Sequence, residues 1–243
     1  MSSEQVQVIS RERVAAYGEV YTAKREVNAM LNLVKTEAER VDSRFLEPAC
    51  GRGIFLTEIL SRKLIAAEKS SAVPRSKKII PYECEKQFVI AISSIYGVDI
   101  LHDNIAECRK NLFEVWDRKY TKDCGSYAND ECREAVRFII KRNIVCGNAL
   151  SLMKVDDQGY DTDEPIIFSE WAFITGSKMQ RRDFRFDRLL ANEHIKRSLR
   201  KYRATETTNK ELENPESGKD GDAEGELLTT YITHYRKIHK NDK

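Results

Sequence analysis

The chain has 243 residues, a formal net charge of +2 and a hydrophobic fraction of 41%. With 11 glycines and 5 prolines it is neither collagen-like nor wholly disordered, and no apolar run approaches the roughly 18 residues of a membrane-spanning helix. Ser2, Glu4 and Arg11 interrupt any hydrophobic leader after Met1. We therefore expect a globular, cytoplasmic protein of one domain with appendages and no membrane association.

The six cysteines and four histidines show no metal-binding pattern. No two cysteines form a C-x-x-C pair, and a chain of this length needs no disulfide bonds for stability. We interpret the cysteines as buried core thiols, and expect no metal centre.

The apolar spacing predicts helices that alternate with short strands, which indicates an α/β fold with a mostly parallel sheet. The expected elements, in chain order, are a helix after an N-cap at Thr22, a strand at 44–46, helices at 54–64 and 82–93, a strand at 95–99, helices at 103–120 and 132–140, and strands at 143–146 and 166–168.

The last part of the chain is charged rather than apolar. Residues 178–203 hold ten Lys or Arg against three Asp or Glu, which indicates either a solvated helix face or a surface that contacts phosphates. Residues 204–226 are acidic and almost free of aliphatic side chains, as in a disordered linker, and a short basic tail follows.

Polar residues and glycines gather where the first two predicted strands end. Ligands of parallel α/β sheets collect at the carboxyl ends of the strands, where glycine turns let the backbone approach a ligand, although tight turns also use glycine for conformational reasons alone. Gly51 and Gly53 form such a turn after the first strand. Glu47 beside it suits a cationic ligand, and Asp99 at the end of the next strand can accept both hydroxyls of a ribose.

Four segments carry a resemblance to a known family. They are YGEVYT at 17–22, FLEPACGRGIFL at 45–56, YGVDI at 96–100 and NIVCGNAL at 143–150. In this order they resemble the S-adenosylmethionine-dependent N6-adenine DNA methyltransferases of restriction–modification systems, particularly their modification subunits.

The resemblance implies a Rossmann-like class I methyltransferase fold in three regions. Residues 1–42 would be a helical cap that completes the cofactor pocket, 43–203 the methyltransferase domain, and 204–243 an acidic linker with a basic tail, expected to be disordered. The cofactor would be S-adenosylmethionine. The residues that the resemblance assigns to it are Thr22, Glu47, Ala49, Gly51, Gly53, Asp99, Ile100 and Asn148, where Asn148 replaces a frequent Asp of the family.

The chain departs from the family after the fourth predicted strand. There the family has Asn or Asp, two prolines and an aromatic residue, whereas this chain has Ser169, Glu170 and Trp171. As catalytic residues, Glu170 would accept a hydrogen bond from the amino group of a flipped adenine and Trp171 would stack on the base; a core position for Trp171 is the alternative. The sheet is expected to be truncated after this strand, or to be completed by a partner subunit.

The function expected from these features is methyl transfer to N6 of adenine in DNA within a restriction–modification or defence system. Arg181, Arg182 and Arg185 would contact the DNA. The alternative is a catalytically decayed subunit that binds cofactor and DNA and needs a partner chain. Methyl transfer to RNA, protein or a small molecule stays open because the fold serves many acceptors, whereas a nicotinamide enzyme fits less well because Leu56 occupies the third glycine position of its motif.

Overall fold

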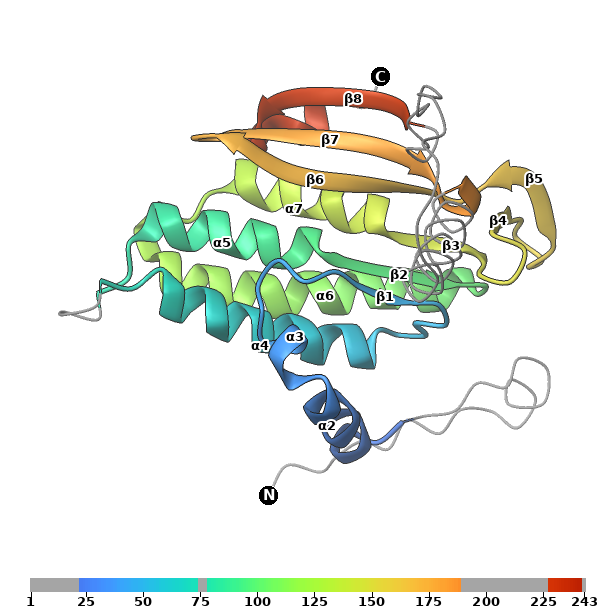
Figure 1. Ribbon diagram of the computed structural model, residues 1–243, viewed down its shortest axis with the longest axis horizontal. Coiled ribbons are helices and arrows are strands. Elements are labelled where there is room, and N and C mark those ends of the chain that lie inside the picture. The colour runs from blue at the N-terminus through green and yellow to red at the C-terminus, as the bar shows by residue number, and fades with distance from the viewer. Residues whose placement is uncertain (1–21, 74–77, 189–226, 242–243) are drawn as a thin grey trace, which may run out of the picture.

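The computed structural model describes residues 22–73, 78–188 and 227–241 (Figure 1). Its helices are α2 (Lys24–Leu33), α3 (Lys35–Ala38), α4 (Ile54–Ser70), α5 (Pro81–Ser93), α6 (His102–Cys124) and α7 (Asp130–Asn143), with 3-10 turns η1 (Gly125–Tyr127) and η2 (Tyr235–Asn241). Its strands are β1 (Phe45–Glu47), β2 (Ile95–Asp99), β3 (Ile144–Asn148), β4 (Met153–Val155), β5 (Asp161–Pro165), β6 (Ile167–Thr175), β7 (Lys178–Arg185) and β8 (Leu227–His234).

The first five strands form a mixed sheet in the order β1-β2-β3-β4-β5. β1, β2 and β3 are parallel, with Phe45 opposite Ile95 and Gly97 opposite Ile144, while β4 and β5 add an antiparallel hairpin at the β3 edge. The prediction of an α/β fold is therefore confirmed. The predicted first three strands lie within two residues of β1, β2 and β3.

The helices before β2 and β3 run almost directly into these strands (Figure 1). Pro81 occupies the first turn of α5, where its missing N–H has no partner to lose. The N-cap of α7 is Asn129, whose side chain accepts a hydrogen bond from the amide of Cys132 at 2.9 Å. The last turn of α7 contains Lys141 and Arg142, whose positive charges suit the helix dipole. Helices α4 to α7 pack on one another, and each also contacts at least one of the three parallel strands.

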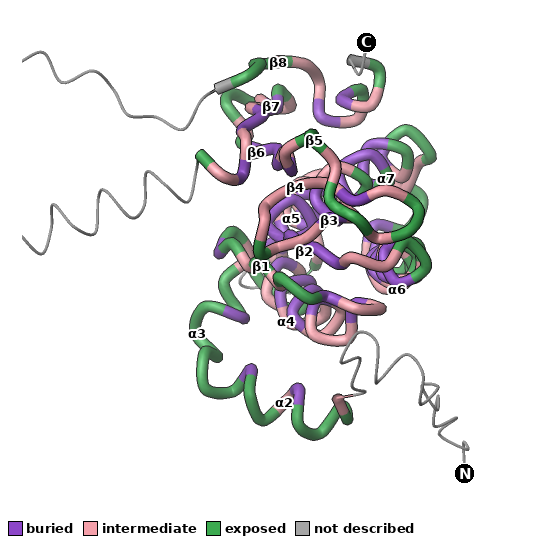
Figure 2. Tube along the Cα trace, turned by 90° about the vertical axis from the view of Figure 1, so that its right-hand side faces the viewer, coloured by how far each residue is buried: buried purple, intermediate pink, exposed green. Residues whose placement is uncertain are grey.

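Two apolar clusters hold the strands in place, and Figure 2 shows the buried residues of α4 to α7 and of β2. The larger lies among α4, α5, α6 and α7, where the Trp116 ring stacks on Tyr120 at 4.5 Å and its Nε1 donates to the carbonyl of Phe88 at 3.1 Å. The smaller joins Tyr96 and Val98 of β2 to the start of β6 and the residue after β7, Phe186. The sheet is thus packed against helices and also against the second sheet.

The fourth predicted strand does not join the parallel sheet, so that prediction is wrong. It is the start of β6, which belongs to a separate antiparallel sheet in the order β6-β7-β8. The basic segment that follows begins as strand β7 rather than as a helix. β4 and β5 lie between the third and fourth predicted strands, where the sequence predicts no strand. The sequence of β7 does not show the usual alternation of apolar and polar residues, because its buried face includes the charged residues Arg181 and Asp183.

Part of the tail that was expected to be disordered is an ordered element. Residues 227–241 form β8, which pairs with β7, and η2, which packs on α7. The expectation for 204–243 is therefore wrong over these residues. Residues 17–21, 189–203 and 204–226, on which other sequence predictions rest, lie outside the described residues.

A buried carboxylate fixes this C-terminal element to the helices. Glu85 of α5 is fully buried and accepts hydrogen bonds from Tyr120 at 2.6 Å, from Arg236 Nε at 2.6 Å and from the hydroxyl of Tyr235. Asn129 adds a longer bond at 3.3 Å. Burial raises the pKa of both tyrosines, so their hydroxyls stay protonated donors.

Candidate cofactor site at the carboxyl end of the parallel strands

Three predicted site residues end three adjacent strands. Glu47 is the last residue of β1, Asp99 of β2 and Asn148 of β3. Since these strands are parallel, their last residues lie at the same edge of the sheet. The turn that contains Gly51 and Gly53 leaves β1 at this edge and leads into α4. The structure thus brings together the principal residues that the sequence predicts for the cofactor.

Asp99 anchors the glycine turn. Its Oδ2 accepts from the amide of Gly51 at 2.8 Å, and its Oδ1 accepts from the amide of Leu101 at 2.9 Å and from Asn104 Nδ2 at 3.3 Å. Asp99 is buried, so these bonds hold the turn against the start of α6. A carboxylate has about four lone-pair sites, which leaves acceptor capacity for a ligand hydroxyl.

The two glycines of the turn differ in their surroundings. Gly53 has φ +83°, and a Cβ at this position would lie 2.6 Å from Cys108 Sγ, so both conformation and space require glycine. Gly51 has φ +49°, but a Cβ there would meet no atom within 4 Å. The backbone of Gly51 is therefore open to a ligand on the side where other residues have a side chain.

Glu47 is half-buried beside this turn, and burial raises the pKa of its carboxyl group. Within the described chain no hydrogen bond or ion pair reaches this carboxylate. A cation placed next to it would relieve the cost of its burial. The neighbouring N-terminus of α4 has Gly53 as its N-cap, which offers no side-chain cap to the first helical amides.

The hairpin of β4 and β5 covers one side of the site, which the sequence did not predict. The Cβ position of Gly159 lies 3.8 Å from Ile100 Cγ1, and His102 Nε2 lies 3.1 Å from the carbonyl oxygen of Asp156. Asn148 Nδ2 donates to Asp161 Oδ1 at 3.0 Å, so this predicted cofactor residue holds the hairpin. The D-x-x-G pattern that ends at Gly159 is the local signal for such a turn.

Of the two remaining predicted cofactor residues, one is in the glycine turn and the other is far from it in the chain. Ala49 is exposed in the turn between β1 and α4, and Thr22 is half-buried just before α2. Helix α2 packs on α4, and its buried residues are Val27 and Leu31. Closure of Thr22 over a ligand stays a prediction.

Two of the three expected catalytic side chains are in the core, so their assignment has to be corrected. Ser169 is fully buried, donates to Asp183 Oδ1 at 2.6 Å and accepts from Arg142 Nε at 3.0 Å. Trp171 is 9% exposed and donates to Asn143 Oδ1 at 2.9 Å. Its ring packs edge-on against Phe138, so it is a core aromatic rather than a stacking surface for a base.

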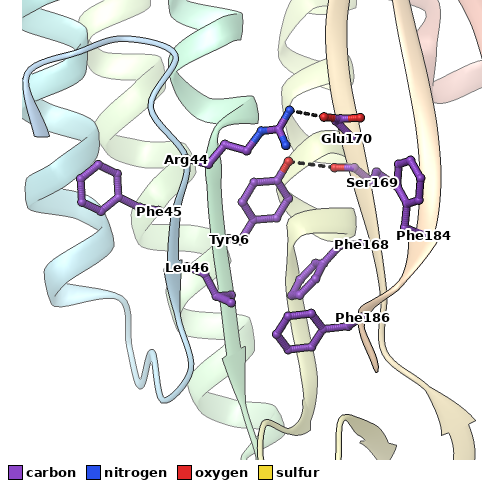
Figure 3. A pocket seen from close by; sticks show the side chains of 9 residues that line it. All are labelled: Arg44, Phe45, Leu46, Tyr96, Phe168, Ser169, Glu170, Phe184 and Phe186. Carbon is purple, nitrogen blue, oxygen red and sulfur yellow. Dashed lines mark hydrogen bonds and ion pairs between the residues drawn. The ribbon is translucent and has the colours of Figure 1, made fainter. Parts of the chain in front are cut away.

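Glu170 is more accessible but lies near the other end of the strands. It forms an ion pair with Arg44, the residue before β1 (Figure 3), and another with Arg182 of β7. Asp99 and the glycine turn, by contrast, are at the carboxyl end. The structure therefore does not bring Glu170 to the predicted cofactor residues. β6 belongs to the second sheet, and Glu170 lies near the amino end of β1.

The predicted DNA-contacting arginines are engaged within the protein. Arg181 is 2% exposed, lies 3.2 Å from Asp183 Oδ2 and stacks 4.1 Å over the Tyr231 ring, so its assignment to a DNA surface is wrong. Arg182 pairs with Glu170, and Arg185 lies 2.9 Å from Asp187 Oδ2. Both side chains are partly accessible, and their contact with a DNA phosphate stays a prediction.

Comparisons with known proteins identify no relative: no family model, curated protein or solved structure matches the chain. Over the described ranges, no group of three or more His, Cys, Asp or Glu residues is arranged to hold a metal ion. Within the same ranges, every helix is too short or too polar to cross a lipid bilayer.

Proposed function

We propose that the chain is the S-adenosylmethionine-binding component of a DNA adenine-N6 methyltransferase, and that a partner chain supplies the groups that hold the base. The observation that carries the first part is the Glu47 carboxylate, half-buried and without a described partner, beside an open glycine turn and Asp99. This combination favours a ligand with both a cationic group and vicinal hydroxyls. The family resemblance supports the same cofactor.

The residues at this edge fit the parts of the cofactor. Glu47 would accept from the α-amino group, and the uncapped first amides of α4 would donate to the carboxylate, as helix N-termini do for anions. Asp99 would use its one remaining lone-pair site for a ribose hydroxyl, and Ile100 would pack on the adenine. When bound, S-adenosylmethionine supplies an electrophilic methyl group on a sulfonium.

The second part of the proposal follows from the positions of Ser169, Glu170 and Trp171. Two of these side chains are in the core, and Glu170 is paired with two arginines away from the cofactor edge. Within the described residues, this leaves no predicted acceptor group beside the proposed methyl donor. We therefore favour the partner-dependent alternative over a self-sufficient enzyme.

The first test is calorimetric titration of the purified full chain with S-adenosylmethionine. We expect the parent chain to bind. Glu47→Gln should bind with an affinity about tenfold or more lower, because a charge-assisted hydrogen bond is removed, and Asp99→Asn should lose a similar amount of affinity. Asp157→Asn is the matched control, because this carboxylate is at the same end of the sheet and its side chain is 96% exposed. Absence of binding to a folded chain would overturn the proposal.

A second test uses tritium transfer from the labelled cofactor to unmethylated genomic DNA. We expect no transfer by the chain alone, and transfer after the partner is added. Transfer by the chain alone would make it a complete enzyme and overturn the partner requirement. Labelling of RNA or protein in place of DNA would change the acceptor while leaving the cofactor site intact.

A further inference from the structure

Two strand edges near the Arg44–Glu170 ion pair have no described strand beside them. β1 pairs only with β2, and β6 pairs only with β7, within the described residues. The amide of Phe45 donates to the carbonyl of Ser94 at 3.0 Å, on the β2 side. Because successive residues of a strand point their backbone groups to opposite edges, the amide and carbonyl of Leu46 face outward.

A cavity of about 250 Å³ lies beside β1, β2 and β6 (Figure 3). Its lining residues are Arg44, Phe45, Leu46, Tyr96, Phe168, Ser169, Glu170, Phe184 and Phe186. The Phe45 ring lies elsewhere, under Lys63 Nζ, and Ser169 Oγ is bonded to Asp183, so both residues line the cavity chiefly with backbone. Main chain as well as side chains is thus accessible from the cavity.

The walls of the cavity are apolar and mutually packed. Phe168 makes edge-on contacts with Tyr96, at 5.4 Å between ring centroids, and with Phe186 at 5.0 Å. The Tyr96 hydroxyl donates to the carbonyl of Ser169 at 2.9 Å, which fixes its ring. A cavity of roughly 150 Å³ holds a benzene molecule, so this one can hold an aromatic side chain.

The mouth of the cavity is charged. Arg44 and Glu170, which line the cavity, form an ion pair, and Arg182 of β7 pairs with the same carboxylate, so that two cations share one anion beside the mouth. The Arg44 side chain is 62% exposed. Leu46, beside it on the free edge, is 42% exposed although it is a large apolar residue.

We propose that an extended segment of a partner protein binds along the free edge of β1, inserts one aromatic side chain into this cavity and carries an acidic residue that faces Arg44. A strand is the one occupant that satisfies the outward amide and carbonyl of Leu46 and fills the cavity at the same time. The excess positive charge at the mouth selects an acidic neighbour. This proposal does not depend on cofactor binding.

The test uses the blocked pentapeptide ETFTV, in which glutamate, phenylalanine and valine share one face when extended. Binding is followed by amide chemical shifts of the ¹⁵N-labelled full chain. We expect a Kd on the order of 1 mM, with slower hydrogen exchange at the Leu46 amide. KTFTV should bind several-fold more weakly, and a peptide N-methylated at phenylalanine should bind at least about tenfold more weakly because a main-chain donor is lost.

Leu46→Glu should abolish peptide binding, whereas Leu33→Glu, at an 86% exposed position of α2, should leave it unchanged. Equal binding of the N-methylated peptide would show a simple apolar pocket and overturn strand addition. Absence of binding by every peptide would also overturn the proposal. So would a dimer in sedimentation that Leu46→Glu dissociates, since a second copy of the chain would then occupy the edge of β1. Titration of both variants with S-adenosylmethionine tests the proposed function separately.

Discussion

Two carboxylates of this molecule, Glu85 and Glu47, have contrasting surroundings, which suit a structural role for the first and the proposed ligand-binding role for the second. Glu85 is fully buried and receives hydrogen bonds from Tyr120, Asn129, Tyr235 and Arg236. Glu47 is half-buried and has no described partner. The first carboxylate is saturated by the fold, whereas the second retains its capacity to bind a ligand.

The largest effect is expected from removing the saturated carboxylate. Glu85→Ala leaves Arg236 and two tyrosine hydroxyls without their acceptor, and breaking a buried ion pair in this way costs about 3–5 kcal/mol. Urea denaturation measures the loss, and hydrogen exchange should show β8 and η2 opening first. Glu85→Gln, which keeps one acceptor oxygen, should lose less. Equal stability of Glu85→Ala and the parent would contradict the importance of this cluster.

Lys63 extends the comparison to a buried cation. It is fully buried and donates to the carbonyl of Val41 at 3.2 Å, to Ser94 Oγ at 2.6 Å and to the carbonyl of Ser43. Burial lowers its pKa to about 7 from an ordinary 10.5. Between these values the unfolded chain binds more protons than the folded one, so stability rises with pH.

Lys63→Met should remove this rise. We expect the parent to gain about 2–4 kcal/mol more than the variant between pH 7 and pH 10, as measured by urea denaturation at each pH. Conservative Lys69→Met, in the last turn of the same helix, is the control. The same slope in Lys63→Met as in the parent would show that Lys63 is already neutral in both states or charged in both.

The smallest effect on stability is expected at Glu47. Its raised pKa means that the folded state favours the protonated form, so the stability it contributes is complete below the ordinary value of 4.5 and is lost as pH rises through the folded pKa. Glu47→Gln should therefore match the parent's stability in acid and slightly exceed it at pH 7, as measured by urea denaturation at each pH.

Thermal unfolding with and without S-adenosylmethionine sharpens this last prediction. Without the cofactor, Glu47→Gln should be the more stable chain at pH 7. With the cofactor in excess, the Tm of the parent should rise more than that of the variant, because ligand binding stabilises the state that binds it. A variant that is less stable than the parent without the cofactor would mean that Glu47 has a structural partner, as Glu85 does.

The arrangement of polar residues and glycines at the carboxyl end of the parallel strands was predictable because its signals are local. The helical spacing within α4 and α6, the buried runs of β2 and β3, and the glycines between β1 and α4 each lie within a few residues of one another. The positions of Glu47 and Asp99 at one edge follow from parallel pairing alone. Only their different degrees of hydrogen bonding required the tertiary structure.

The second sheet was not predictable in this way, since its strands pair over long distances and its buried face is partly charged. Arg181 and Asp183 resemble surface residues in the sequence, yet Asp183 is buried against Arg142, Ser169 and Thr229. The sequence by itself determined the α/β alternation and the polar edge, because both arise from local periodicity. The tertiary structure decided that Ser169 and Trp171 are core residues and that, among the described residues, no strand pairs with the outer edge of β1, because both depend on which distant strands pair.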